Sequence, residues 1–141
     1  MPTSLTPDTL RAPFSRYAHA VEVAAGARLL FVSGQLGVGP DDAVPEGAAA
    51  QAELCFDNVE AVLTAAGMTL AHVVRVNAYV TGREHLDAYM AVRNARFAGN
   101  APASTLMVVS GFAREAFHVE VEIVAAEDGV AGGSDADAVG P

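Results

Sequence analysis

The stretch that decides the fold is Phe31-Val32-Ser33-Gly34-Gln35-Leu36, together with Val119-Glu120-Val121-Glu122-Ile123 near the other end of the chain. Both stretches are rich in the β-branched and aromatic residues that favour strands. In the second stretch, apolar residues alternate with Glu120 and Glu122, which is the pattern of a strand with one buried face and one polar face. The sequence therefore predicts a strand near each end of the folded region.

Hydrophobic periodicity gives the elements between these two strands. Apolar residues recur at spacings of three and four over residues 52–66, which predicts a helix that Gly67 ends. A second helix is expected over residues 83–97, with Thr81 as its N-cap. Its apolar stripe also contains Arg93. The expected strands cover residues 17–23, 29–33, 73–80, 104–109 and 116–126, the first two forming a hairpin.

The resulting order is ββαβαββ, an α+β fold in which a mixed β-sheet carries two helices packed on one face. The length of 141 residues suits one domain, which we place at residues 1–126. The first dozen residues contain two prolines and no clear period, so an irregular arm is expected there. Residues 127–141 contain four acids, four glycines and no bases, and we expect them to form a disordered acidic tail.

Composition excludes several classes of function. The formal net charge of −9 argues against nucleic acid as a partner, because that affinity depends on cationic contacts. All eight basic residues are arginines, so no lysine can form a Schiff base. The histidines show no metal-ligand spacing, and no phosphate-binding loop is present, so neither a metal nor a cofactor is expected.

The expected location follows from the cysteine count and hydropathy. Cys55 is the single cysteine and cannot form a disulfide within the chain. No leader peptide and no apolar run long enough for a membrane span is evident. We therefore expect a cytoplasmic protein with no membrane partner.

The two strand motifs, together with Tyr17 and Pro102-Ala103-Ser104-Thr105, resemble the Rid family of reactive-intermediate deaminases, also called YjgF-like proteins. Asn58 and Ala65-Ala66-Gly67 in the first helix add to the resemblance, which covers residues 14–126. Rid proteins have a chorismate-mutase-like fold and hydrolyse small enamines and imines. The resemblance implies a homotrimer that binds a small molecule in clefts between its subunits.

The resemblance also suggests roles for individual residues. In deaminating relatives the glutamate that matches Glu120 activates a water molecule, so Glu120 is the catalytic candidate. Ser33 and Gly34 would offer a hydroxyl and a backbone N–H to substrate oxygen, and Tyr17 would line the cleft. The alternative readings stay open: Glu120 as part of the polar face of a strand, Gly34 as a turn glycine, and Tyr17 as a half-buried aromatic.

Two residues bear on how a substrate carboxylate would be held. Ser104 stands where deaminating relatives carry the arginine that binds this carboxylate, and a hydroxyl supplies neither its charge nor its forked geometry. Arg93, on the apolar stripe of the second helix, either pairs with a glutamate or supplies the missing cation from another wall. Both residues are therefore candidates for substrate binding.

Three functions follow from these observations. The first is an enzyme without a cofactor that processes a small reactive enamine or imine by acid–base chemistry through Glu120. The second is a trimer that binds a small molecule in the same clefts without catalysis. The third is a recruited pathway isomerase or cyclase that uses Glu120 to move a proton.

Overall fold

The computed structural model describes residues 2–14 and 17–129, which form two α-helices, six strands and two short 3₁₀ turns. The main sheet has four strands in the spatial order β3-β6-β4-β5. Their bounds are β3 (Arg28–Leu36), β6 (Val119–Glu127), β4 (Val73–Val80) and β5 (Ala103–Val108). β6 is antiparallel to both of its neighbours, whereas β4 and β5 are parallel. The mixed sheet predicted from the sequence is confirmed.

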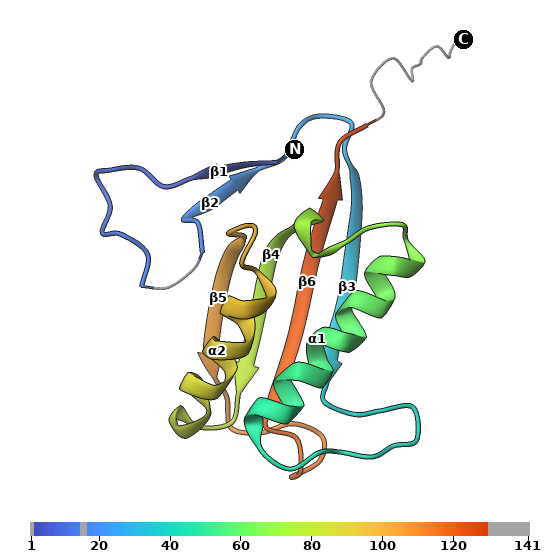
Figure 1. Cartoon of the computed structure of the whole chain (residues 1–141). Coiled ribbons are helices and arrows are strands. Elements are labelled where there is room, and N and C mark those ends of the chain that lie inside the picture. Colours follow the sequence, from blue (N-terminus) through green and yellow to red (C-terminus); the bar gives the residue numbers. More distant parts are fainter. Residues whose placement is uncertain (1, 15–16, 130–141) are drawn as a thin grey trace.

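Both helices cover the same face of this sheet (Figure 1). Helix α1 (Ala48–Ala65) lies across β6 and β3, and helix α2 (Leu86–Arg96) lies beside it over β4 and β5. Between them, Arg96 forms ion pairs with three acids of α1, Glu53, Asp57 and Glu60, at N–O distances of 2.8, 2.8 and 2.6 Å. Among the residues that the structure describes, no helix has the length and apolar character needed to cross a bilayer.

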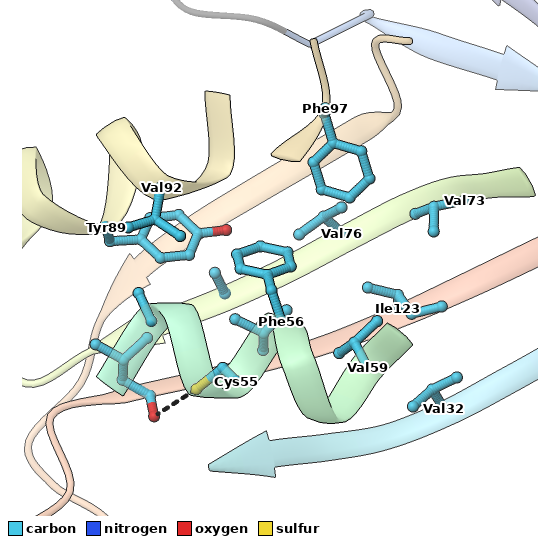
Figure 2. Close-up of a cluster of buried hydrophobic side chains, with 14 of the residues drawn as sticks. Val32, Cys55, Phe56, Val59, Val73, Val76, Tyr89, Val92, Phe97 and Ile123 are labelled. Atoms are coloured by element: carbon cyan, nitrogen blue, oxygen red, sulfur yellow. Dashed lines mark hydrogen bonds between the residues drawn. The ribbon is translucent and has the colours of Figure 1, made fainter. Parts of the chain in front are cut away.

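An aromatic cluster fills the space between the helices and the sheet (Figure 2). The rings of Phe56 and Tyr89 stack with centroids 6.2 Å apart, and the rings of Phe56 and Phe97 meet edge to face at 5.7 Å. All three side chains are fully buried, and Val76 and Val59 pack around them. Large buried rings of this kind supply much of the stabilisation of a small core.

The N-terminal part of the chain corrects the predicted hairpin. Strand β2 (Ala20–Glu22) does not pair with β3. It pairs with β1 (Thr3–Leu5), a strand in the region where an irregular arm was expected. The turn at Gly26, with φ of 83°, redirects the chain, and β3 finds its partner in β6, about ninety residues further on. Strand propensity is local, but pairing is not, so the sequence pattern predicted these strands without their partners.

The start of α2 corrects the predicted N-cap at Thr81. A 3₁₀ turn (Arg83–His85) precedes the helix, and Gly82 occupies its cap position without a side-chain bond. The hydroxyl of Thr81 instead lies 3.1 Å from Nδ1 of His118. β6 likewise begins at Val119, later than the predicted residue 116, and continues to Glu127. The predicted tail lies outside the described residues from residue 130 onward.

The end of α1 confirms the predicted role of Gly67. Gly67 has φ of 73°, its N–H donates to the carbonyl of Thr64 at 2.9 Å, and the N–H of Met68 donates to that of Leu63 at 2.8 Å. This is the paired hydrogen bonding of a Schellman motif, which places a left-handed residue directly after the helix. It turns the chain so that Met68 is buried under the helix end.

We expect Gly67→Ala to lower the free energy of unfolding by about 1 kcal/mol, because an L side chain is strained at this φ. A Cβ at Gly67 would meet no atom within 4 Å, so the cost comes from the backbone alone. Gly99→Ala is the matched control, since Gly99 also has open space but no positive φ. Urea unfolding at fixed protein concentration measures both variants. Equal stability of the two would contradict this account of the helix end.

Candidate functional site

Three of the predicted binding residues meet in one pocket. Tyr17, Arg93 and Ser104 line a cavity of about 240 Å³ between α2, β5 and the N-terminal segment. We call it the Arg93 pocket. Its other walls are the apolar side chains Phe14, Met90 and Leu106.

The backbone of the N-terminal segment fixes Tyr17 beside Ser104. The N–H of Ala18 donates to the carbonyl of Pro102 at 3.1 Å, and Ala18 forms a parallel bridge with Ala103. Ala18 is buried, so this docking is part of the fold. The residues on either side, Tyr17 and Ser104, therefore reach the same pocket although they are far apart in the sequence.

Arg93 brings a cation into this pocket. Its side chain is 2% exposed, and Nη1 donates to Ser104 Oγ at 2.8 Å while Nη2 donates to Asn94 Oδ1 at 3.1 Å. Burial lowers the pKa of the guanidinium from its ordinary value, yet arginine keeps its proton near neutral pH. The sequence left open whether Arg93 pairs with a glutamate or faces a ligand. In the structure it contacts the hydroxyl of Ser104 and borders the cavity.

The catalytic candidate Glu120 lies on the other face of the sheet. The buried residues Val119, Val121 and Ile123 of β6 point to the helices, and Glu120 and Glu122 point to the open face that no helix covers. Glu120 pairs in register with Tyr79 of β4 and with Leu36 of β3. Its carboxylate is half-buried against the backbone of β3.

Gly34 makes room for that carboxylate. The register of β3 against β6 shifts between Val32 and Gln35, and a Cβ built on Gly34 would lie 2.5 Å from Oε2 of Glu120. No side chain fits there without moving the glutamate. The sequence suggested that Gly34 lets a ligand approach the backbone; in the structure, the missing side chain admits Glu120, and Ser33 lies next to it in the same irregular stretch.

A polar cluster on β4 and β6 continues this open face. The hydroxyl of Tyr79 donates to Oε1 of Glu122 at 2.5 Å, and Nδ2 of Asn77 donates to the same oxygen at 3.4 Å. Asn77, Glu122 and Ser33 border a hollow of about 320 Å³. The bond to Glu122 raises the pKa of Tyr79, so the phenol remains a proton donor.

Burial, and to a smaller extent the negative charge of Glu122, raises the pKa of Glu120 above the ordinary glutamate value. A carboxylate with a raised pKa binds a proton more strongly, which is the property that a general base requires. Cys55 offers no competing nucleophile, because burial raises the pKa of its thiol to about 12. Its Sγ donates to the carbonyl of Val119 at 3.5 Å (Figure 2).

The structure divides the predicted residues into two groups. Tyr17, Arg93 and Ser104 lie on the helix side of the sheet edge, and Ser33, Gly34 and Glu120 lie on its open face or at its bulge. The register decides this separation, because Ser104 pairs with Val76, whose side chain points to the helices. Within one chain the two groups do not form one site.

The sequence analysis did not identify some residues near these sites. Phe14 and Leu106 line the Arg93 pocket, and Asn77 and Tyr79 hold Glu122. The alternation of β4 already placed Asn77 and Tyr79 on one face, but nothing in the sequence showed that this face adjoins Glu120 and Glu122.

Other hollows contain none of the predicted site residues. A cavity of about 510 Å³ lies between the loop after β3 and His118, above the buried Gln51. Gln51 anchors that loop, donating to the carbonyls of Pro45 and Ala116 and accepting from the N–H of His118. Over residues 2–14 and 17–129, no group of three or more His, Cys, Asp or Glu side chains has a metal-binding arrangement.

Comparison with known proteins identifies the family. Residues 9–127 match the family model described as Endoribonuclease L-PSP. The chain belongs to this family, the Rid/YjgF proteins. The crystal structure of the Rid-family protein YyfB from Yersinia pestis superposes with a TM-score of 0.79 at 30% identity, covering 88% of this chain and 97% of that one. The chorismate-mutase-like fold that the resemblance implied is confirmed.

Curated Rid relatives cover nearly the whole chain. Protein HMF1 of Saccharomyces cerevisiae is 33% identical over 131 residues, which is 90% of this chain and 98% of the yeast protein. The 2-iminobutanoate/2-iminopropanoate deaminase of Escherichia coli is 26% identical over 133 residues, covering 89% of this chain and 98% of the relative. Imine deamination thus occurs among named relatives of similar length.

We expect Glu122→Gln to lower the pKa of Glu120 toward the ordinary glutamate value, because it removes the neighbouring negative charge while keeping the shape of the side chain. The carboxyl resonances of glutamates, followed by NMR during a pH titration, report this pKa directly. Glu115→Gln is the control, since Glu115 is exposed and lies outside the cluster. If the pKa of Glu120 in Glu122→Gln equals that in the wild type, the charge of Glu122 does not raise it and burial is the sole cause of the raised pKa.

Proposed function

We propose that this Rid protein hydrolyses a small reactive imine or enamine, with Glu120 as the general base, in clefts between the subunits of a homotrimer. The observation that carries the proposal is the half-buried Glu120 carboxylate, with its raised pKa, seated against Gly34. The position of this glutamate matches the one that the family resemblance assigns to catalysis. A related protein named as a 2-iminobutanoate/2-iminopropanoate deaminase supports the reaction class.

The chemistry requires one proton acceptor and no cofactor. Glu120 accepts a proton from water as the water oxygen bonds to the imine carbon and the π electrons of the C=N bond move to nitrogen. The nitrogen takes this proton from Glu120, which gives the neutral carbinolamine. Glu120 then accepts the proton of the carbinolamine hydroxyl and passes it to the nitrogen, so that the C–N bond breaks as the C=O bond forms and ammonia leaves. The products are a carbonyl compound and ammonia. Ser33 and the backbone N–H at Gly34 would bind substrate oxygen.

The separation of the two residue groups supports a site shared between subunits. A neighbouring copy that places its Glu120 face against the Arg93 pocket would complete the site. The open face of the sheet is suited to association, because it exposes Leu29, Phe31 and Met107, with exposed fractions of 51%, 72% and 51%. Exposed apolar side chains gathered on one sheet face are typical of an interface.

Ser104 distinguishes this chain from its deaminating relatives. It takes the place of the arginine that holds the substrate carboxylate in those proteins. The proposed substrate is therefore bound by a different arrangement, in which Tyr17 and Arg93 share the pocket with Ser104.

The family description mentions RNA cleavage, but we do not propose RNA as the substrate. The net charge of −9 opposes binding of a phosphate backbone, which requires clustered cations. The proposed substrate is a small molecule.

We expect the protein to accelerate ammonia release from 2-iminobutanoate generated in situ by an amino-acid oxidase. Glu120→Gln should lower the catalysed rate by about 100-fold or more, the usual contribution of a general base. Because the active form is the carboxylate, the rate should rise as pH increases through the raised pKa of Glu120.

Glu115→Gln serves as the control and should keep full activity. If the wild type does not exceed the uncatalysed rate over the whole pH range, hydrolysis of this imine is rejected. Stabilisation by small ligands without turnover would then favour the non-catalytic binding protein, since a ligand specific for the folded state raises apparent stability.

We expect Phe31→Asp to break up the proposed homotrimer, because a carboxylate would be buried in the apolar contact between sheet faces. Sedimentation equilibrium measures the change in mass. Leu10→Asp is the control, since Leu10 is also an exposed apolar residue but lies outside the main sheet. A trimer that tolerates Phe31→Asp as well as Leu10→Asp would place the interface elsewhere.

A further inference from the structure

We propose that Glu122 of β6 is a second catalytic carboxylate, which binds the nitrogen of the substrate and stabilises the positive charge that forms on it before ammonia leaves. The inference rests on the proposed function and deepens it, because it assigns the nitrogen end of the reaction to a named side chain. It also defines the substrate class as imines and enamines whose nitrogen carries only hydrogen.

Glu122 lies beside Glu120 on the open face of the sheet. Residues two apart on one face of a strand are separated by about 7 Å, twice the rise per residue. The charge of Glu122 contributes to the raised pKa of Glu120, so the two carboxylates interact across this distance. In inverting glycosidases, two carboxylates about 6.5 to 9.5 Å apart leave room for a reacting water between them. The pair on β6 can therefore hold water at one end and a substrate nitrogen at the other.

Hydrogen bonds from β4 prepare Glu122 for this role. The hydroxyl of Tyr79 donates to Oε1 of Glu122 at 2.5 Å, and Nδ2 of Asn77 donates to the same oxygen at 3.4 Å. These donors hold the carboxylate in place and stabilise its negative charge. Both bonds end at Oε1, so Oε2 can accept an N–H from a ligand. Arg75, the basic residue of β4 on this face, donates to Thr105 Oγ1 at 2.7 Å.

The hollow of about 320 Å³ on the open face gives the substrate nitrogen access to Glu122. Glu122 and Ser33 border this hollow, and Phe31 forms an apolar wall. Ser33 directly precedes Gly34, whose missing side chain admits the carboxylate of Glu120. The hollow therefore adjoins the candidate base along β3 as well as along β6. Its volume is at the lower end of the range for ligand pockets, which suits a small substrate.

A carboxylate at this position favours departure of ammonia. The nitrogen of the carbinolamine carries two hydrogens and becomes an ammonium group when it takes a third proton. The electron pair of the C–N bond then moves to nitrogen as ammonia leaves. Glu122 stabilises a positive charge that the neutral carbinolamine lacks, so it lowers the barrier of this step. An alkyl group on the nitrogen would replace a hydrogen that Glu122 binds, which explains the substrate class.

The kinetic test compares ammonia release from 2-iminobutanoate by the wild type, Glu122→Gln and Glu115→Gln over a range of pH. Loss of a charge-assisted hydrogen bond should lower kcat of Glu122→Gln by about tenfold or more. The loss should persist above the raised pKa of Glu120, where Glu120 is ionised in both proteins. This high-pH plateau separates the role at nitrogen from the effect of Glu122 on the pKa of Glu120. Glu115→Gln changes an exposed residue and should keep the wild-type plateau.

The binding test uses methylammonium as a probe of the nitrogen site. Tetramethylammonium is the matched probe, since it has the same charge but no N–H to donate. At fixed pH and ionic strength, methylammonium alone should shift two NMR signals saturably, the side-chain carboxyl of Glu122 and the side-chain amide of Asn77. The shift at Asn77 should disappear in Glu122→Gln. The titration of the wild type needs neither turnover nor a substitution, so it tests the site even if Glu122→Gln does not fold.

Other results would overturn the role of Glu122. An equal shift with tetramethylammonium, or no saturable shift at Glu122, would reject nitrogen binding. Ammonia release that depends on Glu120 but has the same kcat plateau in Glu122→Gln rejects the inference and leaves the reaction standing. Methylammonium binding that depends on Glu122, in a protein that releases no ammonia, supports the nitrogen site and rejects only the proposed reaction.

Discussion

The rest of the structure depends on the pairing of β6 between β3 and β4. This strand has a neighbour on each side, so its two-residue period is fixed in register across most of the sheet. Val119, Val121 and Ile123 face the helices and are buried in the core. The same alternation sends Glu120 and Glu122 to the open face. A slip of one residue would put both carboxylates into the core. The register that buries the apolar residues of β6 is therefore the same register that places Glu120, the candidate base, on the open face.

The irregular stretch of β3 makes room for the carboxylate of Glu120 on the neighbouring strand β6. A regular strand with a side chain at position 34 would clash with Glu120, and the glycine removes the clash. Asn58 of α1 holds the chain just beyond it, donating to the carbonyls of Leu36 and Val38 at 3.1 and 3.2 Å. Asn58 thereby connects helix α1 to the end of the strand that adjoins Glu120.

The buried guanidinium of Arg93 is the second feature with consequences beyond its own contacts. A charge moved from water into a protein interior is costly unless polar groups or an opposite charge compensate for it. Ser104 and Asn94 accept hydrogen bonds from the guanidinium, and apolar side chains line the cavity beside it. In this arrangement the guanidinium of a helix residue reaches the hydroxyl of Ser104 on β5.

The sequence by itself determined the two helices, the strands of the main sheet, the helix end at Gly67, the family and the two faces of β6, because periodicity and glycine conformation are local properties of the chain. Only the tertiary structure decided that β2 pairs with β1, that Gly34 adjoins Glu120, and that Arg93 meets Ser104. These contacts join residues that are distant in the sequence. Local propensity does not indicate which distant strand or side chain a residue will contact. The opposite placement of Glu120 and Ser104 has the same origin, since the face that each residue occupies follows from the register of the assembled sheet.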